Sequence, residues 1–535
     1  MITRPYDVLR AWIGKTDLRA IGRTWPDVLG VLVGAAYAIP TLAYPFGRDQ
    51  AIFYYIGREW LHGTLPYRDA FDLKPPGVYA LHSLAVLMFG AHQWSIRIAD
   101  ILCVLALGKV ISLAVRRDGD RVRGELGAVV ALLSGVYFTS FDFWDSGQAE
   151  LWEAFFVIAG LAVLERIRSP LRAPLVSGIL GCIALLFKFT AGLIVVPLGF
   201  LAVVRGWRDA GPQVTTGRRV LRSLAAGGLF ALGTLVPVAI VVAYFAAHRA
   251  SNSLWELIGY LGHYAQTGAS PADARSRVEM FWLTRSGLWV AAFAGLWLAG
   301  SLRSASRRRW HVLSGAVFAA LLVTLAFASV VAQKKYFSYH WGVVVPFLVL
   351  AAAYGLAELA RWSPGVATLH ALSVVLGGFL TAPPWYTNPA LTYRTYALET
   401  FRDYRAGRLP REQFVKVFKG VSNYDYAAQE YISGLILQRA RPGDLLHVRG
   451  FELAMYAITG MRTPCRFVSE LPLDEPWLFF HRDQWLAQQN QALWSSRPRF
   501  IVTFVDRPWD VSLIASHGYH EIGRRGLFLL MLRND

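Results

Sequence analysis

The recurrence of long apolar runs constrains the fold of this chain more than any other feature. A helix needs about 20 predominantly apolar residues to cross a hydrocarbon layer of about 30 Å, and runs near this length recur between residues 27 and 382. Of the 535 residues, 55% are hydrophobic and only 17% are charged, which excludes an ordinary soluble domain. The sequence therefore predicts a polytopic α-helical membrane protein.

About eleven membrane spans are expected, and one further apolar run is expected not to cross. The spans are placed at 27–45, 95–115, 125–141, 149–165, 173–187, 190–204, 221–246, 284–301, 311–332, 340–360 and 365–382. Val78–Gly90 is a short apolar run that follows Pro75-Pro76 and is interrupted by His82. Its length predicts an interfacial or re-entrant helix and not a crossing. Lys188 separates two short spans and should lie at an outer interface or in a wet cavity, because a lysine at the bilayer centre costs about 2.5–3.5 kcal/mol.

The distribution of basic residues predicts the orientation. The net charge of +18 comes from clusters in alternate connections, so the positive-inside rule explains it better than nucleic-acid binding does. These clusters are Arg4, Arg10, Lys15, Arg19 and Arg23; Arg116, Arg117, Arg121 and Arg123; Arg166, Arg168 and Arg172; Arg205, Arg208, Arg218, Arg219 and Arg222; and Arg303, Arg307, Arg308 and Arg309. We therefore expect a cytoplasmic N-terminus, an uncleaved first helix, and an external location for the 45–94 connection and for the C-terminal part.

From about residue 383 the pattern changes to short strands that alternate with helices. Leu445–Val448, Phe500–Phe504 and Leu527–Leu532 read as strands, and no Gly-rich phosphate-binding sequence follows the first of them. The expected organisation is a transmembrane domain at 1–382 and an extracytoplasmic α/β accessory domain at 383–535. The three cysteines have no CxxC spacing, so neither a disulfide framework nor a zinc site is expected.

The stretch Tyr44–Tyr79, directly after the first span, carries the residues most suited to chemistry. Asp49 can act as a general base at the membrane surface, or it can be the N-cap of the amphipathic helix that follows; both roles can coexist. Lys74 stands on a proline-stiffened turn, where it can bind a lipid phosphate or simply extend to the interface. Asp72 is a second acidic candidate. Arg68 reads as a local partner of Asp69 and is kept as a candidate substrate contact.

Two further groups of polar residues lie at predicted span ends. Residues 333–341 read QKKYFSYHW, which predicts either an anionic pocket or an aromatic belt with interfacial lysines. Gln148 and Glu150 begin the fourth span, where a carboxylate suggests function or complements the helix dipole. These two residues and Lys188 are candidate substrate contacts.

The first external connection resembles that of the GT-C superfamily of membrane glycosyltransferases. It has an acidic residue after the first span, then an interfacial helix, and then the sequence Asp72-Leu73-Lys74-Pro75-Pro76-Gly77. More specifically, the pattern looks like the branch that contains protein O-mannosyltransferases and bacterial aminoarabinose-to-lipid A transferases. The resemblance implies that Asp49 is catalytic and that Lys74 binds the donor phosphate. It also implies phosphate contacts by Lys335 and Tyr339, four residues apart, and His340 beside them is a further candidate.

The sequence also departs from that family. The aminoarabinose transferases carry a glutamate directly before the motif lysine, where it can ligate zinc; here Leu73 occupies that position. This departure argues against a metal site, and no cofactor is expected. The residue after the catalytic acid, often acidic in the family, is Gln50.

The resemblance implies an inverting transfer from a polyprenyl-phosphate-linked sugar to a hydroxyl of a lipid, polysaccharide or protein acceptor. The Arg- and Ala-rich composition is compatible with a bacterium, so the cytoplasmic (inner) membrane is the expected location. Two alternatives are a transporter or flippase of lipid-linked saccharides and a non-catalytic GT-C-like assembly protein. The crowding of charges at one external face favours the enzyme over the transporter.

Overall fold

A computed structural model describes residues 18–116, 124–211, 213–301, 309–380, 393–418, 424–474 and 481–534. The predicted domain boundary at 382/383 lies outside these ranges. So do several of the basic residues used to predict the orientation: Arg4, Arg10, Lys15, Arg117, Arg121, Arg123, Arg303, Arg307 and Arg308.

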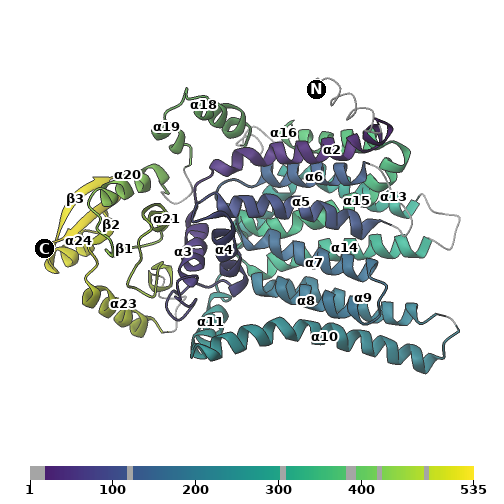
Figure 1. Cartoon of the computed structure of the whole chain (residues 1–535), viewed down its shortest axis with the longest axis horizontal. Coiled ribbons are helices and arrows are strands. Elements are labelled where there is room, and N and C mark those ends of the chain that lie inside the picture. The colour runs from purple at the N-terminus through teal and green to yellow at the C-terminus, as the bar shows by residue number, and fades with distance from the viewer. Residues whose placement is uncertain are drawn as a thin grey trace, which may run out of the picture.

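A bundle of long helices forms the larger part of the molecule (Figure 1). A helix lies over each of the predicted spans: α2 (Leu18–Ala38), α5 (Ser95–Val115), α6 (Glu125–Ser140), α7 (Ala149–Arg166), α8 (Arg172–Phe187), α9 (Gly192–Asp209), α10 (Thr216–Ala247), α13 (Ser286–Ser301), α14 (Arg309–Gln333), α15 (Val344–Trp362) and α16 (Pro364–Leu380). Six segments of the described chain are long and apolar enough to cross a membrane by length and composition: Trp25–Ala43, Trp94–Val115, Phe189–Asp209, Thr216–Ala247, Gly315–Gln333 and Ser338–Trp362. The full count of crossings stays a prediction.

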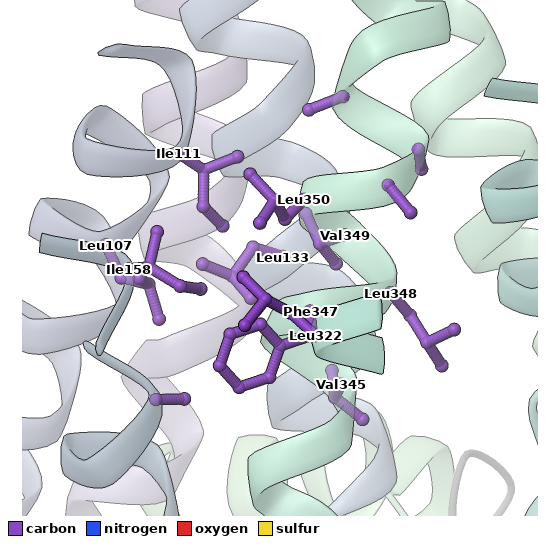
Figure 2. Close-up of a cluster of buried hydrophobic side chains, with 14 of the residues drawn as sticks. Leu107, Ile111, Leu133, Ile158, Leu322, Val345, Phe347, Leu348, Val349 and Leu350 are labelled. Carbon is purple, nitrogen blue, oxygen red and sulfur yellow. The ribbon is translucent and has the colours of Figure 1, made fainter. Parts of the chain in front are cut away.

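Helix α15 is the centre of the bundle. In the segment Ser338–Trp362, which contains α15, 83% of the most apolar 18 residues are buried, whereas the value for Thr216–Ala247, which is α10, is 22%. Figure 2 shows Phe347 and Leu350 of α15 among Ile111, Leu133 and Ile158, which come from α5, α6 and α7. Because α15 is apolar on all sides, it has neighbouring helices around it rather than at one face only.

Small residues allow some helices to approach at backbone distance. A Cβ atom added to Gly30 of α2 would lie 2.1 Å from the carbonyl oxygen of Gly127 in α6. No larger side chain fits at that crossing. Close approach through glycine is a common way for membrane helices to pack, since lipid tails supply no hydrophobic driving force between them.

The connections at one end of the bundle carry the polar stretch. Helix α3 (Arg48–Trp60) and helix α4 (Pro76–Phe89) lie between the bundle and the C-terminal part of the chain (Figure 1). Helix α4 covers the apolar run that was predicted not to cross. Its first residue is Pro76, and proline suits the first position of a helix. The α6–α7, α8–α9 and α14–α15 connections lie at the same end as α3.

The C-terminal part, residues 393–534, forms a small α/β unit. Its sheet has the order β1-β2-β4-β3, with β1 (Leu446–Val448) parallel to β2 (Phe500–Phe504) and the other pairs antiparallel. Strands β3 (Tyr519–Arg525) and β4 (Phe528–Arg533) complete it. Its helices are α18 (Phe401–Arg405), α19 (Arg411–Val415), α20 (Tyr426–Leu437), α21 (Ala454–Thr459), α22 (Leu471–Asp474), α23 (Arg482–Ser496) and α24 (Pro508–Ser516).

The three predicted strands are confirmed as β1, β2 and β4. Strand β3 was not predicted, because its residues are mostly polar and exposed at the edge of the sheet. One continuous apolar cluster joins this unit to α3 and α4, with Phe71, Phe467 and Trp485 in mutual ring contact. The C-terminal unit therefore packs directly on the polar stretch.

Candidate active site

Helix α3 fixes the position of Asp49. The N-cap of α3 is Gly47, so Asp49 is the second helical residue and lies in the first turn. The alternative interpretation of Asp49 as the N-cap is therefore wrong. Its half-buried carboxylate accepts a hydrogen bond of 3.4 Å from Nε2 of Gln148 and interacts with the phenol of Tyr339.

Gln50, the residue after Asp49, holds the α6–α7 connection against α3. Its Nε2 donates to the carbonyl oxygens of Trp144 at 2.6 Å and Ser146 at 2.7 Å. This contact brings Gln148, at the end of the same connection, next to Asp49. An acidic residue at position 50 could not donate these two hydrogen bonds.

Lys74 is buried between aromatic rings close to Asp49. Only 9% of the residue is exposed, and its Nζ lies 5.7 Å from the ring centre of Phe53 and 5.1 Å from that of Tyr339. Two tyrosine hydroxyl groups hold the backbone of Lys74. The Tyr67 hydroxyl donates to the carbonyl oxygen of Lys74 at 2.8 Å, and the Tyr79 hydroxyl accepts from its amide at 3.2 Å. Within the described residues its ammonium group has no ion pair. This buried position favours an anion-binding role over a lysine extended to the interface.

Asp72 supports the turn that carries Lys74. Its Oδ2 accepts a hydrogen bond of 2.7 Å from the hydroxyl of Tyr79. Burial raises the pKa of Asp72 above its usual range, against the lowering effects of the Tyr79 hydrogen bond and the Lys74 charge. The contacts of Asp72 with Tyr79 and with the backbone of Leu73 fit a structural role at the turn.

Lys188 and Glu150 form a buried ion pair at the same end of the bundle. Burial lowers the pKa of Lys188, while the Glu150 carboxylate raises it. Lys188 lies in the α8–α9 connection, where it is 9% exposed and paired with an acid. Its location at an outer interface or in a wet cavity stays a prediction. Glu150 also interacts electrostatically with Tyr339, which joins this pair to the Asp49 group.

The segment between α14 and α15 supplies Lys335, Tyr339 and His340. The ammonium group of Lys335 donates to Oγ1 of Thr267 and to the carbonyl oxygen of Tyr264, the latter at 3.3 Å. Lys335 therefore contacts the connection between α11 (Ser251–Tyr264) and α12 (Pro271–Thr284). The His340 ring is buried at 4.7 Å from the Tyr339 ring, within the electrostatic influence of Lys74, Lys188 and Lys335.

Arg68 is the predicted residue that the structure does not bring to this group. Its guanidinium pairs with Asp69 at 2.7 Å on the surface and donates to the carbonyl oxygen of His248 at 3.1 Å. Among the described residues no hydrogen bond joins it to Asp49 or Lys74.

Arg97 and Asp145 also lie in this region, and neither was predicted as a site residue. Arg97, fully buried in α5, donates to Oγ of Ser146 at 2.6 Å and to the carbonyl oxygen of Pro45 at 2.9 Å, and so ties two connections together. Asp145 accepts a hydrogen bond from Ser338, and burial together with the Asp142 carboxylate raises its pKa well above its usual range. An arginine inside a predicted span was the available signal for the first.

The arrangement combines a partly accessible carboxylate with buried cations at one end of an apolar bundle. Such a site can bind an anionic group on a lipid while the acyl or isoprenoid chain lies between helices, and it can accept a proton near that group. No group of three or more His, Cys, Asp or Glu side chains among the described residues is arranged to hold a metal ion.

Comparisons with known proteins identify the fold. The family described as dolichyl-phosphate-mannose-protein mannosyltransferase matches residues 73–215. The crystal structure of ArnT from Cupriavidus metallidurans bound to undecaprenyl phosphate is 18% identical, with a TM-score of 0.60 over 94% of this chain and 97% of that chain. Its apo state gives the same identity and coverage, with a TM-score of 0.59. No curated protein matches the chain. The predicted resemblance to the GT-C superfamily is confirmed, and the chain has this membrane-protein fold.

Proposed function

We propose that this protein is a membrane glycosyltransferase that moves a sugar from a polyprenyl-phosphate carrier to a hydroxyl group of an acceptor. One observation carries the proposal: Asp49 and Lys74 both interact with Tyr339 at one end of the bundle. The likeness in fold to a protein crystallised with undecaprenyl phosphate supports it. The family match, which begins at Leu73 directly before Lys74, is a second support.

In the proposed reaction Asp49 removes the proton from the acceptor hydroxyl. The oxygen attacks the anomeric carbon from the face opposite the phosphate, so a new glycosidic bond forms with inversion. The bond from the anomeric carbon to the phosphate oxygen breaks, and the phosphate leaves with the electron pair and one more negative charge. A positioned general base typically contributes about 10²–10⁴ in rate.

Lys74, Lys335 and Tyr339 bind the departing phosphate in this proposal. Fixed donors aimed at a developing charge stabilise the transition state more than the ground state, and they act more strongly where water is excluded. The burial of Lys74 between two rings meets that condition. Lys335 would reach the phosphate only by exchanging its present contacts with Tyr264 and Thr267.

The proposed active site faces the extracytoplasmic side. The charge distribution supports this orientation. Arg166 ends α7, Arg172 begins α8 and Arg205 lies near the C-terminal end of α9, and these helix ends are the ones away from α3. The C-terminal unit then lies outside as an accessory domain, and the N-terminus is cytoplasmic. The acceptor is a lipid, polysaccharide or protein that carries a free hydroxyl.

The test is sugar transfer by the purified chain in proteoliposomes, with a panel of polyprenyl-phosphate sugars and a membrane extract as the source of acceptor. The wild type should form a labelled product that Asp49→Asn fails to form while it still binds polyprenyl phosphate. Equal transfer by the two proteins would refute the role of Asp49. Movement of the labelled donor across the bilayer without any transfer would instead identify a flippase.

A further inference from the structure

The residue directly before Asp49 is bound by the C-terminal unit. Nε of Arg48 donates to Oε1 of Glu452 at 2.8 Å, and the two side chains form an ion pair between residues 404 positions apart. The Arg48 side chain is 16% exposed and that of Glu452 only 3%. Arg48 is the first residue of α3, so this contact acts on the turn that carries Asp49.

Both partners of this ion pair are themselves fixed. The second oxygen of Glu452 accepts a hydrogen bond of 2.8 Å from Nε2 of Gln429 in α20. The guanidinium of Arg48 lies 5.7 Å from the ring centres of Trp144 and Phe451 and 6.0 Å from that of Tyr424. Charge-assisted pairs of this kind define a geometry as well as an energy, because the planar guanidinium must align with the carboxylate.

The backbone before Arg48 is held from the same side. The hydroxyl of Tyr424 donates to the carbonyl oxygen of Phe46, and the amide of Phe46 donates to Oε1 of Gln93 at 2.9 Å. Gln93 in turn donates to the hydroxyl of Tyr426 at 2.9 Å. The C-terminal unit thus holds Phe46 and Arg48, one on each side of the N-cap Gly47.

Asp49 therefore lies between two anchored neighbours. Arg48 is bound to the C-terminal unit, and Gln50 is bound to the α6–α7 connection. The half-buried carboxylate of Asp49 accepts a 3.4 Å hydrogen bond from Gln148 and interacts with Tyr339. The anchored residues on either side fix the backbone from which this carboxylate extends.

We propose that Arg48 and Glu452 are positioning residues, through which the C-terminal unit orients the Asp49 carboxylate toward the acceptor hydroxyl. This inference rests on the proposed function, in which Asp49 is the general base. It gives the C-terminal unit a part in the reaction: the catalytic turn is assembled from both parts of the chain.

The experiment compares Glu452→Gln with a matched control. Glu452→Gln keeps the size of the side chain and removes the charge that binds Arg48. A misplacement of about 1 Å can cost about 10²-fold in rate, so kcat should fall about 10- to 100-fold while KM for the donor stays unchanged. Arg462→Gln is the control, since Arg462 pairs the same unit with Glu59 near the other end of α3. It should leave kcat unchanged.

Two further variants keep the inference falsifiable if Glu452→Gln does not fold. The exchange of charges in Arg48→Glu with Glu452→Arg should recover part of the kcat lost by either single change. Arg48→Lys keeps the charge but loses the planar contact, and it should lower kcat less than Glu452→Gln does. Wild-type kcat in Arg48→Lys would overturn the inference.

The other outcomes are equally distinct. Wild-type kcat in folded Glu452→Gln, or equal losses in Glu452→Gln and Arg462→Gln, would overturn the positioning role, while an inactive Asp49→Asn would leave the proposed function standing. Wild-type transfer by Asp49→Asn would refute the proposed function itself and the inference with it.

Discussion

Replacing Lys74 by glutamine should weaken the binding of polyprenyl phosphate by about 10- to 100-fold. A hydrogen bond to a charged group is worth about 1.5–3 kcal/mol, and each 1.4 kcal/mol is a factor of about ten in affinity. The upper part of this range applies because Lys74 is 9% exposed and lies between the rings of Phe53 and Tyr339. Glutamine retains most of the side-chain length, so the packing of these rings should change little.

The assay is equilibrium binding of a labelled polyprenyl phosphate to the purified protein, followed by the transfer rate. The loss in kcat/KM should exceed the loss in donor affinity, since the phosphate gains charge as it leaves. Lys334→Gln is the matched control, because Lys334 is an exposed lysine at the same end of the bundle. If Lys74→Gln binds polyprenyl phosphate as well as the wild type does, the assignment of Lys74 to the phosphate is refuted.

Three further predictions concern buried charges. Lys188→Met should destabilise the protein by about 3–5 kcal/mol, because the charge of Glu150 is left buried; Lys188→Met with Glu150→Leu should unfold closer to the wild-type temperature. Tyr79→Phe removes the hydrogen bond that the Asp72 carboxylate accepts. Burial raises the pKa of Asp72, so more of this group is protonated at pH 4 than at pH 7. The loss in unfolding free energy caused by Tyr79→Phe should therefore be larger at pH 7 than at pH 4. Cys465 and Glu470 raise the pKa of His447 to about 9, against the lowering effect of burial. Protonated His447 should therefore stabilise the C-terminal unit fully below about pH 6.5, and this stabilisation should disappear as the pH rises through 9. The melting temperature of the wild type should fall over this pH range because of His447, and that part of the fall should be absent in His447→Gln.

The helices and the main site residues were accessible from the sequence because their signals are local. Apolar length is a property of each span by itself, and a helix lies over every span that it predicted. Asp49 and Lys74 stand in one polar stretch, and the pattern Asp72 to Gly77 carries its own resemblance. The error at Asp49 was also local: Gly47 supplies the N-cap, although aspartate is more often found in that position.

The pairings across the fold were not accessible in this way. Arg48 and Glu452 are 404 residues apart, and no periodicity or motif around either residue predicts a contact with the other. The cost of a lone charge predicted an outer interface or a wet cavity for Lys188, but it did not predict the ion pair with Glu150, which depends on how α7 packs against α8. Strand β3 was missed because an exposed edge strand needs apolar residues on one face at most. These features depend on tertiary contacts that local sequence does not specify.

The role of Asp49 as the general base is best tested by the single-turnover rate of sugar transfer by Asp49→Asn. With donor and acceptor bound in advance, this rate reports the chemical step alone, so effects on binding do not enter. If Asp49 is the general base, this rate should be about 10²–10⁴-fold below that of the wild type, with unchanged affinity for polyprenyl phosphate. A single-turnover rate equal to that of the wild type would contradict it, since the base would then be a different residue.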